Sequence, residues 1–275
     1  MSEIIRIEDF GDPRLDLFVR LTGAQLRSSI ESERGVFIAE SPTVIEVALD
    51  SGCKPIALLT DERLINGSVE KIIERCSDVP IYTAKRDVLE KLTGFALTRG
   101  ALCAMQRPKM PSLDELLKGA RTVAVLENIA DSTNIGAVFR SAAALGVDAV
   151  LVTPDCCDPL CRRAVRVSMG TIFRVPWGVI GESQADWREN GVKLLQSHGF
   201  KTAAMALNEN SVNIDDVALM KEERIAVILG TEGTGLAKST IENSDYTVMI
   251  PMQNEVDSLN VAAAGVIAFW QLTRR

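Results

Sequence analysis

The stretch from Ile225 to Phe269 constrains the fold most strongly. It opens with the short apolar run 225–229, rich in β-branched residues, which is typical of a strand buried on both faces of a parallel sheet. A glycine-rich loop follows, then a second apolar strand beginning at Tyr246, and then a polar loop that leads into an apolar helix at 259–272. Because parallel strands end along one edge of a sheet, we expect the two loops to form a ligand-binding crevice there.

Three glycines in the first loop let the backbone approach a ligand closely, because no Cβ stands in the way (Gly230, Gly233 and Gly235). A dinucleotide-binding fingerprint would need glycine at the position of Glu232, and a phosphate-binding P-loop would need lysine after Gly235, where Leu236 stands. A carboxylate beside the loop would also repel a pyrophosphate. Both nucleotide-binding interpretations are therefore disfavoured, whereas glycines that only form turns remain an alternative for this loop taken alone.

The rest of the sequence alternates predicted strands and helices, which indicates an α/β fold with a largely parallel sheet. Up to a basic, proline-containing segment at 107–112, strands are expected at 36–39, 56–59, 79–82 and 101–105, and helices at 16–27, 69–76, 87–92 and from Pro42 onward. Beyond it, strands are expected at 122–126, 149–152 and 201–206, and helices at 134–145 and 184–197. We therefore predict two domains, 1–106 and 121–275, joined by a linker at 107–120.

Two polar residues are predicted to begin helices in the second domain. Asn134 is the expected N-cap of the helix that runs to Leu145, and Ser258 is the expected N-cap of the final helix, with Asn260 in its first turn. Arg140 falls outside the apolar stripe of the first of these helices, and its neighbours on the same line of the helix are small (Gly136 and Ala144). We therefore expect its guanidinium to be accessible to another surface.

The distribution of charge points to one basic region in an acidic chain. A net charge of −7 argues mildly against nucleic-acid binding, since phosphate contacts supply most of that affinity. The window 159–181, however, holds no Asp or Glu and four arginines. We predict that Arg162, Arg163 and Arg166 contact nucleic-acid phosphates. The alternative is a solvated helix face.

The cysteines and the apolar runs exclude other classes of protein. Six cysteines in a chain that opens without a signal-peptide core are expected to be reduced thiols. Cys156, Cys157 and Cys161 lie close together, but the only histidine, His198, is distant in sequence, so we expect no metal site. The longest apolar run is far shorter than the roughly 20 residues of a membrane span, so a cytoplasmic protein is expected.

Three segments in order resemble the motifs of the SpoU-type RNA ribose 2′-O-methyltransferases of the SPOUT superfamily. They are Asn-Ile-Gly-Ala-Val-Phe-Arg-Ser-Ala at 134–142, Gly-Thr-Glu-Gly-Thr-Gly-Leu at 230–236, and Ile-Pro-Met at 250–252 with Ser-Leu-Asn-Val at 258–261. The segment 37–49 also resembles the ribosomal-protein-like substrate-binding domain that often precedes the catalytic domain in this family. Two departures are Ser41, where the family often has glycine, and Ser132, where it often has proline.

The resemblance implies a fold, a cofactor and a set of site residues. The catalytic domain would carry a deep trefoil knot, built from roughly 201–269, that binds S-adenosylmethionine in a bent shape. By matching motif positions, the implied catalytic residues are Asn134, Arg140, Glu232, Ser258 and Asn260, and the residues implied to bind the cofactor are Leu207, Gly230, Ile250 and Leu259.

The resemblance also implies a partner and a substrate. The protein would act as a homodimer in which Arg140 completes the cofactor site of the other subunit. Since a guanidinium is a poor base, we expect Arg140 to stabilise the developing alkoxide electrostatically. The substrate would be RNA, with ribosomal RNA favoured over transfer RNA because of the additional N-terminal domain. A non-catalytic RNA-binding module on the same fold and a nicotinamide-dependent oxidoreductase are the alternatives.

Overall fold

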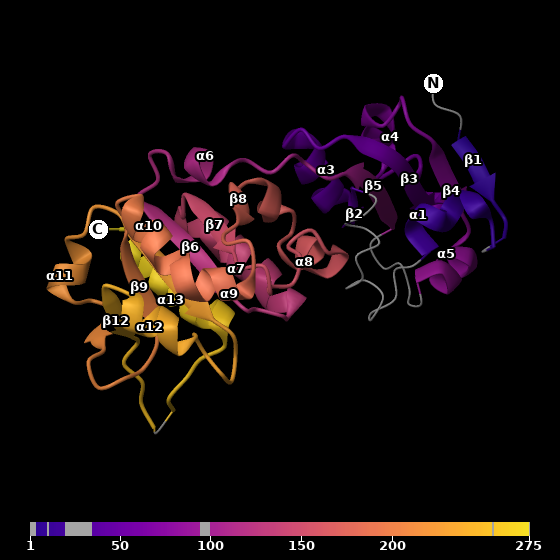
Figure 1. Cartoon of the computed structure of the whole chain (residues 1–275). Coiled ribbons are helices and arrows are strands. Elements are labelled where there is room, and N and C mark those ends of the chain that lie inside the picture. The colour runs from indigo at the N-terminus through magenta and orange to yellow at the C-terminus, as the bar shows by residue number, and fades with distance from the viewer. Residues whose placement is uncertain (1–3, 10, 20–34, 94–99, 255, 275) are drawn as a thin grey trace. The chain divides into compact units, whose positions relative to one another are not determined.

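The computed structural model describes residues 4–9, 11–19, 35–93, 100–254 and 256–274. The chain divides into two compact units, the first made of 1–109 and 158–173, the second of 110–157 and 174–275 (Figure 1). The first boundary falls inside the linker predicted at 107–120. This division groups the segment 158–173 with the first unit, whereas the sequence places it in the catalytic domain, and the predicted domain bounds stay a prediction.

The first unit is a five-stranded mixed sheet with helices, and its strands follow the order β1-β4-β3-β5-β2. The strands are β1 (Ile4–Ile7), β2 (Val36–Glu40), β3 (Pro55–Asp61), β4 (Ile81–Ala84) and β5 (Ala101–Gln106). The helices are α1 (Asp16–Val19), α3 (Pro42–Asp50), α4 (Glu70–Arg75), α5 (Arg86–Thr93) and α8 (Arg162–Val167). Each strand predicted in this part of the sequence is present, and β1 was not predicted. Of the helix predicted at 16–27, only the start lies within the described residues.

Buried contacts hold the segment 158–173 in the first unit. Arg162 is 2% exposed, and its Nε donates to Oε2 of the buried Glu40 at 2.9 Å. Arg166 contacts the same oxygen at 3.4 Å. The Phe173 ring lies 5.1 Å from that of Phe37, measured between centroids. Burial and pairing with Glu40 correct the prediction that Arg162 contacts RNA phosphate, because its guanidinium is already committed to a carboxylate inside the unit.

The second unit contains a seven-stranded parallel sheet in the order β10-β12-β9-β11-β6-β7-β8, which confirms the predicted fold class (Figure 1). The strands are β6 (Thr122–Glu127), β7 (Ala149–Val152), β8 (Trp177–Val179), β9 (Lys201–Met205), β10 (Val212–Asn213), β11 (Ile225–Gly230) and β12 (Tyr246–Met249). The helices are α6 (Leu113–Leu117), α7 (Ser132–Leu145), α9 (Gln184–Asp186), α10 (Val192–Ser197), α11 (Val217–Met220), α12 (Lys238–Asn243) and α13 (Val261–Leu272). A π-helical turn, Trp187–Gly191, joins α9 to α10.

Two predicted helix starts were wrong by two or three residues. The N-cap of α7 is Asp131, whose carboxylate accepts from the Thr133 N–H at 2.6 Å, so Asn134 lies inside the helix. The N-cap of α13 is Asn260, whose Oδ1 accepts from the Ala262 N–H at 2.9 Å, and Ser258 precedes the helix. In both cases a short carboxylate or amide side chain caps the helix, so the residue that was predicted as the cap does not bond to the free N–H groups of the helix.

The order of the last strands explains how the motifs meet. β12 follows β11 in the chain but pairs with the far side of β9, and α13 then returns to pack against α7 and β11. The chain therefore crosses back over its own sheet in this region. The trefoil knot predicted for 201–269 stays a prediction, and this crossing is compatible with it.

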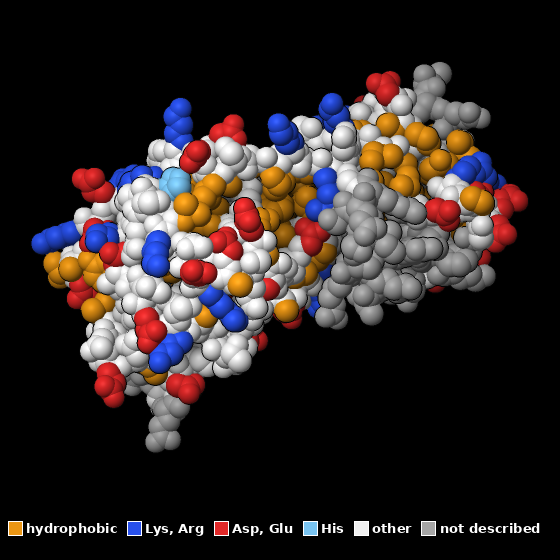
Figure 2. Space-filling view, viewed as in Figure 1, with side chains coloured by type: hydrophobic (Ala, Val, Ile, Leu, Met, Phe, Trp, Pro, Cys, Tyr) orange, Lys and Arg blue, Asp and Glu red, His pale blue; other side chains and the backbone are white. Residues whose placement is uncertain are grey.

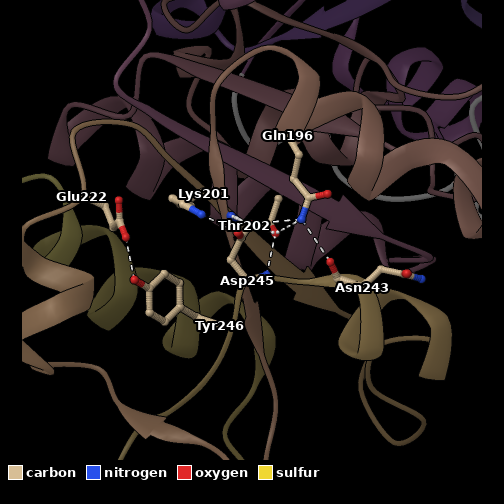
Figure 3. Close-up of polar contacts among 7 residues, drawn as sticks. All are labelled: Gln196, Lys201, Thr202, Glu222, Asn243, Asp245 and Tyr246. Carbon is tan, nitrogen blue, oxygen red and sulfur yellow. Dashed lines mark hydrogen bonds and ion pairs between the residues drawn. The ribbon is translucent and has the colours of Figure 1, made fainter.

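A polar network fixes β12 beside β9 at the end of the sheet where these strands begin (Figure 3). The carboxylate of Asp245 accepts from Lys201 Nζ at 2.8 Å, from Thr202 Oγ1 at 2.8 Å and from Gln196 Nε2 at 3.1 Å. Burial raises the pKa of Asp245, but these hydrogen bonds outweigh burial and lower the pKa to about 2. The next residue, Tyr246, donates its hydroxyl to Glu222 at 2.5 Å.

The lowered pKa of Asp245 predicts acid-sensitive stability. Because the folded pKa lies below the unfolded value of about 3.9, the stabilisation is fully present above pH 4 and is lost as pH falls towards 2. Asp245→Asn should lower the free energy of unfolding by about 1–2 kcal/mol at pH 7, and this deficit should shrink at pH 3. Denaturant unfolding at the two pH values measures this. Glu242→Gln, which removes an exposed ion pair on α12, should change little, and an equal deficit in both variants would contradict the assignment.

Candidate active site

The glycine loop after β11 folds back on itself, and this shape requires glycine at position 230. Gly235 N donates to Thr231 O at 3.0 Å and closes the loop. A Cβ on Gly230 would lie 2.5 Å from the Gly235 carbonyl carbon and 2.6 Å from Leu236 N. Both neighbours are backbone atoms, which cannot rotate away as a side chain would. At Gly230 the start of the loop therefore packs closely against the backbone of its end, at Gly235 and Leu236.

Three predicted catalytic residues from distant parts of the chain form one hydrogen-bonded cluster. Asn134 of α7 donates its Nδ2–H to Glu232 Oε1 at 2.8 Å, and Asn260 donates to Asn134 Oδ1 at 3.0 Å. Asn260 also donates to the same Glu232 oxygen. The amide of Asn260 is oriented by its role as a cap, because its Oδ1 faces the backbone N–H groups of α13 and its Nδ2 must face the cluster. The cluster thus joins the glycine loop, the start of α7 and the start of α13.

The other two predicted catalytic residues stand outside this cluster. Ser258 is exposed in the loop before α13. Arg140 is exposed on α7, six residues beyond Asn134 and thus about 9 Å along the helix. Within the described parts of the chain, no hydrogen bond or ion pair holds its guanidinium. Of its small neighbours, Ala144 is exposed but Gly136 is buried, so the expected line of small residues is accessible over only part of its length.

The residues predicted to bind the cofactor lie near the ends of three adjacent strands. Gly230 ends β11, Ile250 follows β12, and Leu207 lies two residues beyond β9, while Leu259 precedes the cap of α13. Leu207 is 65% exposed and Leu259 is 38% exposed. Exposed apolar side chains at the carboxyl edge of a parallel sheet, next to a glycine loop, are suited to an apolar ligand face such as that of a purine.

The cysteine cluster noted in the sequence is divided between the two units. Cys156 donates its thiol to Leu126 O at 3.1 Å, and Cys161 belongs to the first unit. Among the described residues, no group of three His, Cys, Asp or Glu side chains is placed to hold a metal ion. His198 lies at the carboxyl end of α10, with Nδ1 2.8 Å from Leu194 O. Across the described ranges, no helix is long and apolar enough to cross a membrane.

The sequence and the fold both have relatives among known proteins. The chain is 41% identical over 270 residues to an uncharacterised tRNA/rRNA methyltransferase of Mycobacterium bovis, covering 97% of this chain and 90% of the relative. It is 30% identical to the 23S rRNA (guanosine-2′-O-)-methyltransferase RlmB of Acinetobacter baylyi, covering 78% of this chain and 85% of the relative. The fold is similar to that of an AdoMet-bound rRNA methyltransferase from Sinorhizobium meliloti, with a TM-score of 0.82 at 20% identity and 98% coverage of both chains.

The family assignment rests on the extent of the match. The SpoU rRNA Methylase family model matches residues 121–270, which include the glycine loop and the Asn134, Glu232 and Asn260 cluster. This span is more than half of the chain, and the mycobacterial relative extends the match to nearly its whole length. The chain belongs to the SpoU rRNA methylase family.

Proposed function

We propose that this protein transfers the methyl group of S-adenosylmethionine to a ribose 2′-hydroxyl of ribosomal RNA, and that it acts as a homodimer. The family to which the chain belongs is named for rRNA methylation, and an rRNA methyltransferase of similar fold has AdoMet bound. The observation that carries the proposal is the cluster of Asn134, Glu232 and Asn260 beside the glycine loop. A module that only bound RNA would not need these three side chains to be held together.

The residues at the carboxyl edge of the sheet fit the proposed cofactor. The backbone of Gly230, Ile250 and Leu259 would hold its polar groups, and the exposed side chain of Leu207 would cover its apolar face. Bound there, the cofactor supplies an electrophilic methyl group on a sulfonium. The Glu232 carboxylate, held by two amide donors, keeps the glycine loop aligned with α7 and α13 and so fixes the walls of the site. Positioning of this kind carries much of the catalysis of an in-line displacement.

Arg140 is proposed to act on the ribose oxygen. A guanidinium stays protonated and cannot serve as a base at neutral pH. It can stabilise the negative charge that develops on the 2′-oxygen as the proton leaves. Its exposure and the lack of an ion pair among the described residues leave it available to the site of a second subunit.

RNA contact is proposed for basic residues of the first unit. Arg163 is exposed on α8, whereas Arg166 is partly buried against Glu40. The same unit has an open cavity of about 310 Å³ whose lining contains Lys54, Lys109 and Arg107, the last of which is paired with Asp158. On the face of the second unit seen in Figure 2, acidic and basic side chains are interspersed. The phosphate contacts are assigned to the first unit because of its exposed Arg163 and this basic cavity lining.

The salt dependence of RNA binding tests this surface. Removing one phosphate contact should reduce the slope of log K against log salt concentration by about 0.7 for single-stranded RNA. Replacing Lys54 and Lys109 by alanine should therefore lower the slope by about 1.4, and adding Arg163→Ala should lower it by about 0.7 more. Filter binding over a series of salt concentrations measures the slopes. Lys71→Ala, an exposed lysine on α4, is the control. A slope that does not change in the triple variant would remove this surface from the RNA interface.

The substrate class is tested separately. The Acinetobacter relative is named for methylating 23S rRNA, and the mycobacterial relative is named for tRNA or rRNA. We expect methyl incorporation from labelled S-adenosylmethionine into purified ribosomal RNA of cells that lack the protein, and none into their transfer RNA. Incorporation into transfer RNA alone would reverse the assignment of the substrate.

A further inference from the structure

Glu127, the last residue of β6, is a buried carboxylate at the base of the glycine loop. It is 4% exposed and pairs in the sheet with Gly230, where the loop begins. The rest of β6 is nearly all apolar, so a carboxylate at this position is unusual for the strand. Burying a carboxylate is costly unless its oxygens are satisfied. Its hydrogen-bond partners therefore indicate what this residue does.

The carboxylate accepts three hydrogen bonds from two parts of the chain, the π-helical turn and the start of α12. Oε1 accepts the backbone N–H of Ala237 at 2.6 Å. Oε2 accepts the indole N–H of Trp187 at 2.7 Å and the hydroxyl of Thr240 at 2.6 Å. Only a group with two acceptor oxygens can receive all three. A glutamine amide would turn a donor N–H₂ towards at least one of them.

These bonds hold the far end of the glycine loop. Ala237 is the N-cap position of α12, and its methyl side chain cannot cap the helix. Glu127 binds the backbone of that position and the hydroxyl of Thr240 three residues later. Glu127 thus contacts the loop at both of its ends. Its backbone pairs with Gly230 in the sheet, and its carboxylate accepts the Ala237 N–H. Between these ties lies Glu232, which contacts Asn134 and Asn260.

The carboxylate is itself oriented by a rigid partner. Trp187 is 1% exposed and belongs to the same buried cluster as Leu236 of the loop. A Cβ on Gly191 would lie 2.0 Å from the Trp187 ring, so the π-helical turn that contains both residues lets the indole lie against its own backbone. The indole N–H therefore has a fixed direction, and Glu127 has little freedom to move away from it.

We propose that Glu127 is a positioning residue for the cofactor. By holding Ala237 it keeps the loop 230–237 in the shape that admits S-adenosylmethionine and keeps Glu232 in line with Asn134 and Asn260. The inference rests on the proposed cofactor site. Glu127 does not touch the ligand itself, and it acts through its hydrogen bond to the Ala237 N–H.

Calorimetric titration with S-adenosylmethionine tests this role. Glu127→Gln should unfold cooperatively and bind RNA as the unchanged protein does, while its affinity for S-adenosylmethionine falls at least about tenfold, the usual worth of a hydrogen bond to a charged group. Thr240→Val removes one donor without changing shape and should weaken binding about threefold. Thr240→Ser, which keeps the hydroxyl, should restore it. The control is Asp148→Asn at the opposite end of β6, where the carboxylate accepts the Arg121 and Thr122 N–H groups at 2.8 Å each. It should leave cofactor affinity unchanged.

The outcomes separate this role from a purely structural one. If Glu127→Gln loses stability but keeps its affinity for S-adenosylmethionine, Glu127 only supports the fold and the proposal is overturned. If Glu127→Gln does not fold, the two Thr240 variants decide, and equal affinity in both overturns the proposal. If the unchanged protein itself does not bind S-adenosylmethionine, the proposed cofactor site fails, and this inference fails with it.

Discussion

Gly230→Val should yield a folded protein with no measurable affinity for S-adenosylmethionine. A Cβ at this position would meet three backbone atoms of Gly235 and Leu236 within 2.8 Å. The backbone at Gly235 and Leu236 must therefore move outwards, and the polar backbone groups that would hold the cofactor move with it. The fold should survive because the loop tip from Glu232 to Gly235 is exposed and can shift without opening the core. We expect at least about a hundredfold loss of affinity, equivalent to about 3 kcal/mol.

A second glycine of the same loop provides the matched control. Gly233 has a φ of 87°, but a Cβ there would meet no atom within 4 Å. Gly233→Ala therefore adds backbone strain of about 1 kcal/mol without a collision, and affinity should fall only about fivefold. Calorimetry gives both affinities, and circular dichroism reports the fold. A folded Gly230→Val protein with unchanged affinity would show that the cofactor does not depend on the close contact at Gly230.

The second large effect concerns a site shared between subunits. Arg140→Ala should bind S-adenosylmethionine normally but lose methyl transfer by about 10²–10³-fold, because the developing charge on the ribose oxygen is no longer stabilised. A symmetric dimer would contain two composite sites. In a mixed dimer of Arg140→Ala with Gly230→Val, one site combines the intact cofactor loop of the first chain with the arginine of the second. That site should work.

Mixed dimers should therefore recover about half the activity of the unchanged dimer. They can be prepared by refolding the two variants together and purified through two different affinity tags. Each variant refolded alone is the control and should stay inactive. If Arg140 served its own subunit, each chain of the mixed dimer would lack one essential part. An inactive preparation of verified mixed dimers would thus refute the shared site.

The sequence predicted most strands of the fold because they are continuous apolar runs, but it did not predict the short strands β1, β8 and β10. The run at 149–152 became β7 with the same ends, and the run at 225–229 became β11 with one residue added. Buried parallel strands show such runs because both of their faces are covered. The helix starts were less predictable, because Asp131 and Asn260 compete as caps with the nearby residues Asn134 and Ser258. Only the folded chain shows which oxygen reaches the free N–H groups.

Long-range pairing accounts for what the sequence could not show. Arg162 looked like part of an exposed basic patch because the window 159–181 that contains it holds four arginines and no acidic residue. Its partner, Glu40, is 122 residues away. Glu127 was missed for the same reason, since Trp187, Ala237 and Thr240 are all at least 60 residues distant. A charged residue at the end of an apolar strand was the signal available in the sequence. The cluster of Asn134, Glu232 and Asn260 was found because each residue lies in a recognisable motif.

The most direct measurement of the central claim identifies the methylated atom. The protein is incubated with ribosomal RNA and S-adenosylmethionine labelled in its methyl group, and the RNA is then digested to nucleosides and separated. We predict that the label appears in a 2′-O-methylnucleoside, and that Arg140→Ala, which still binds the cofactor, yields about 10²–10³-fold less of it. Label on a base, or no label from a protein shown to bind both cofactor and RNA, would contradict ribose methylation.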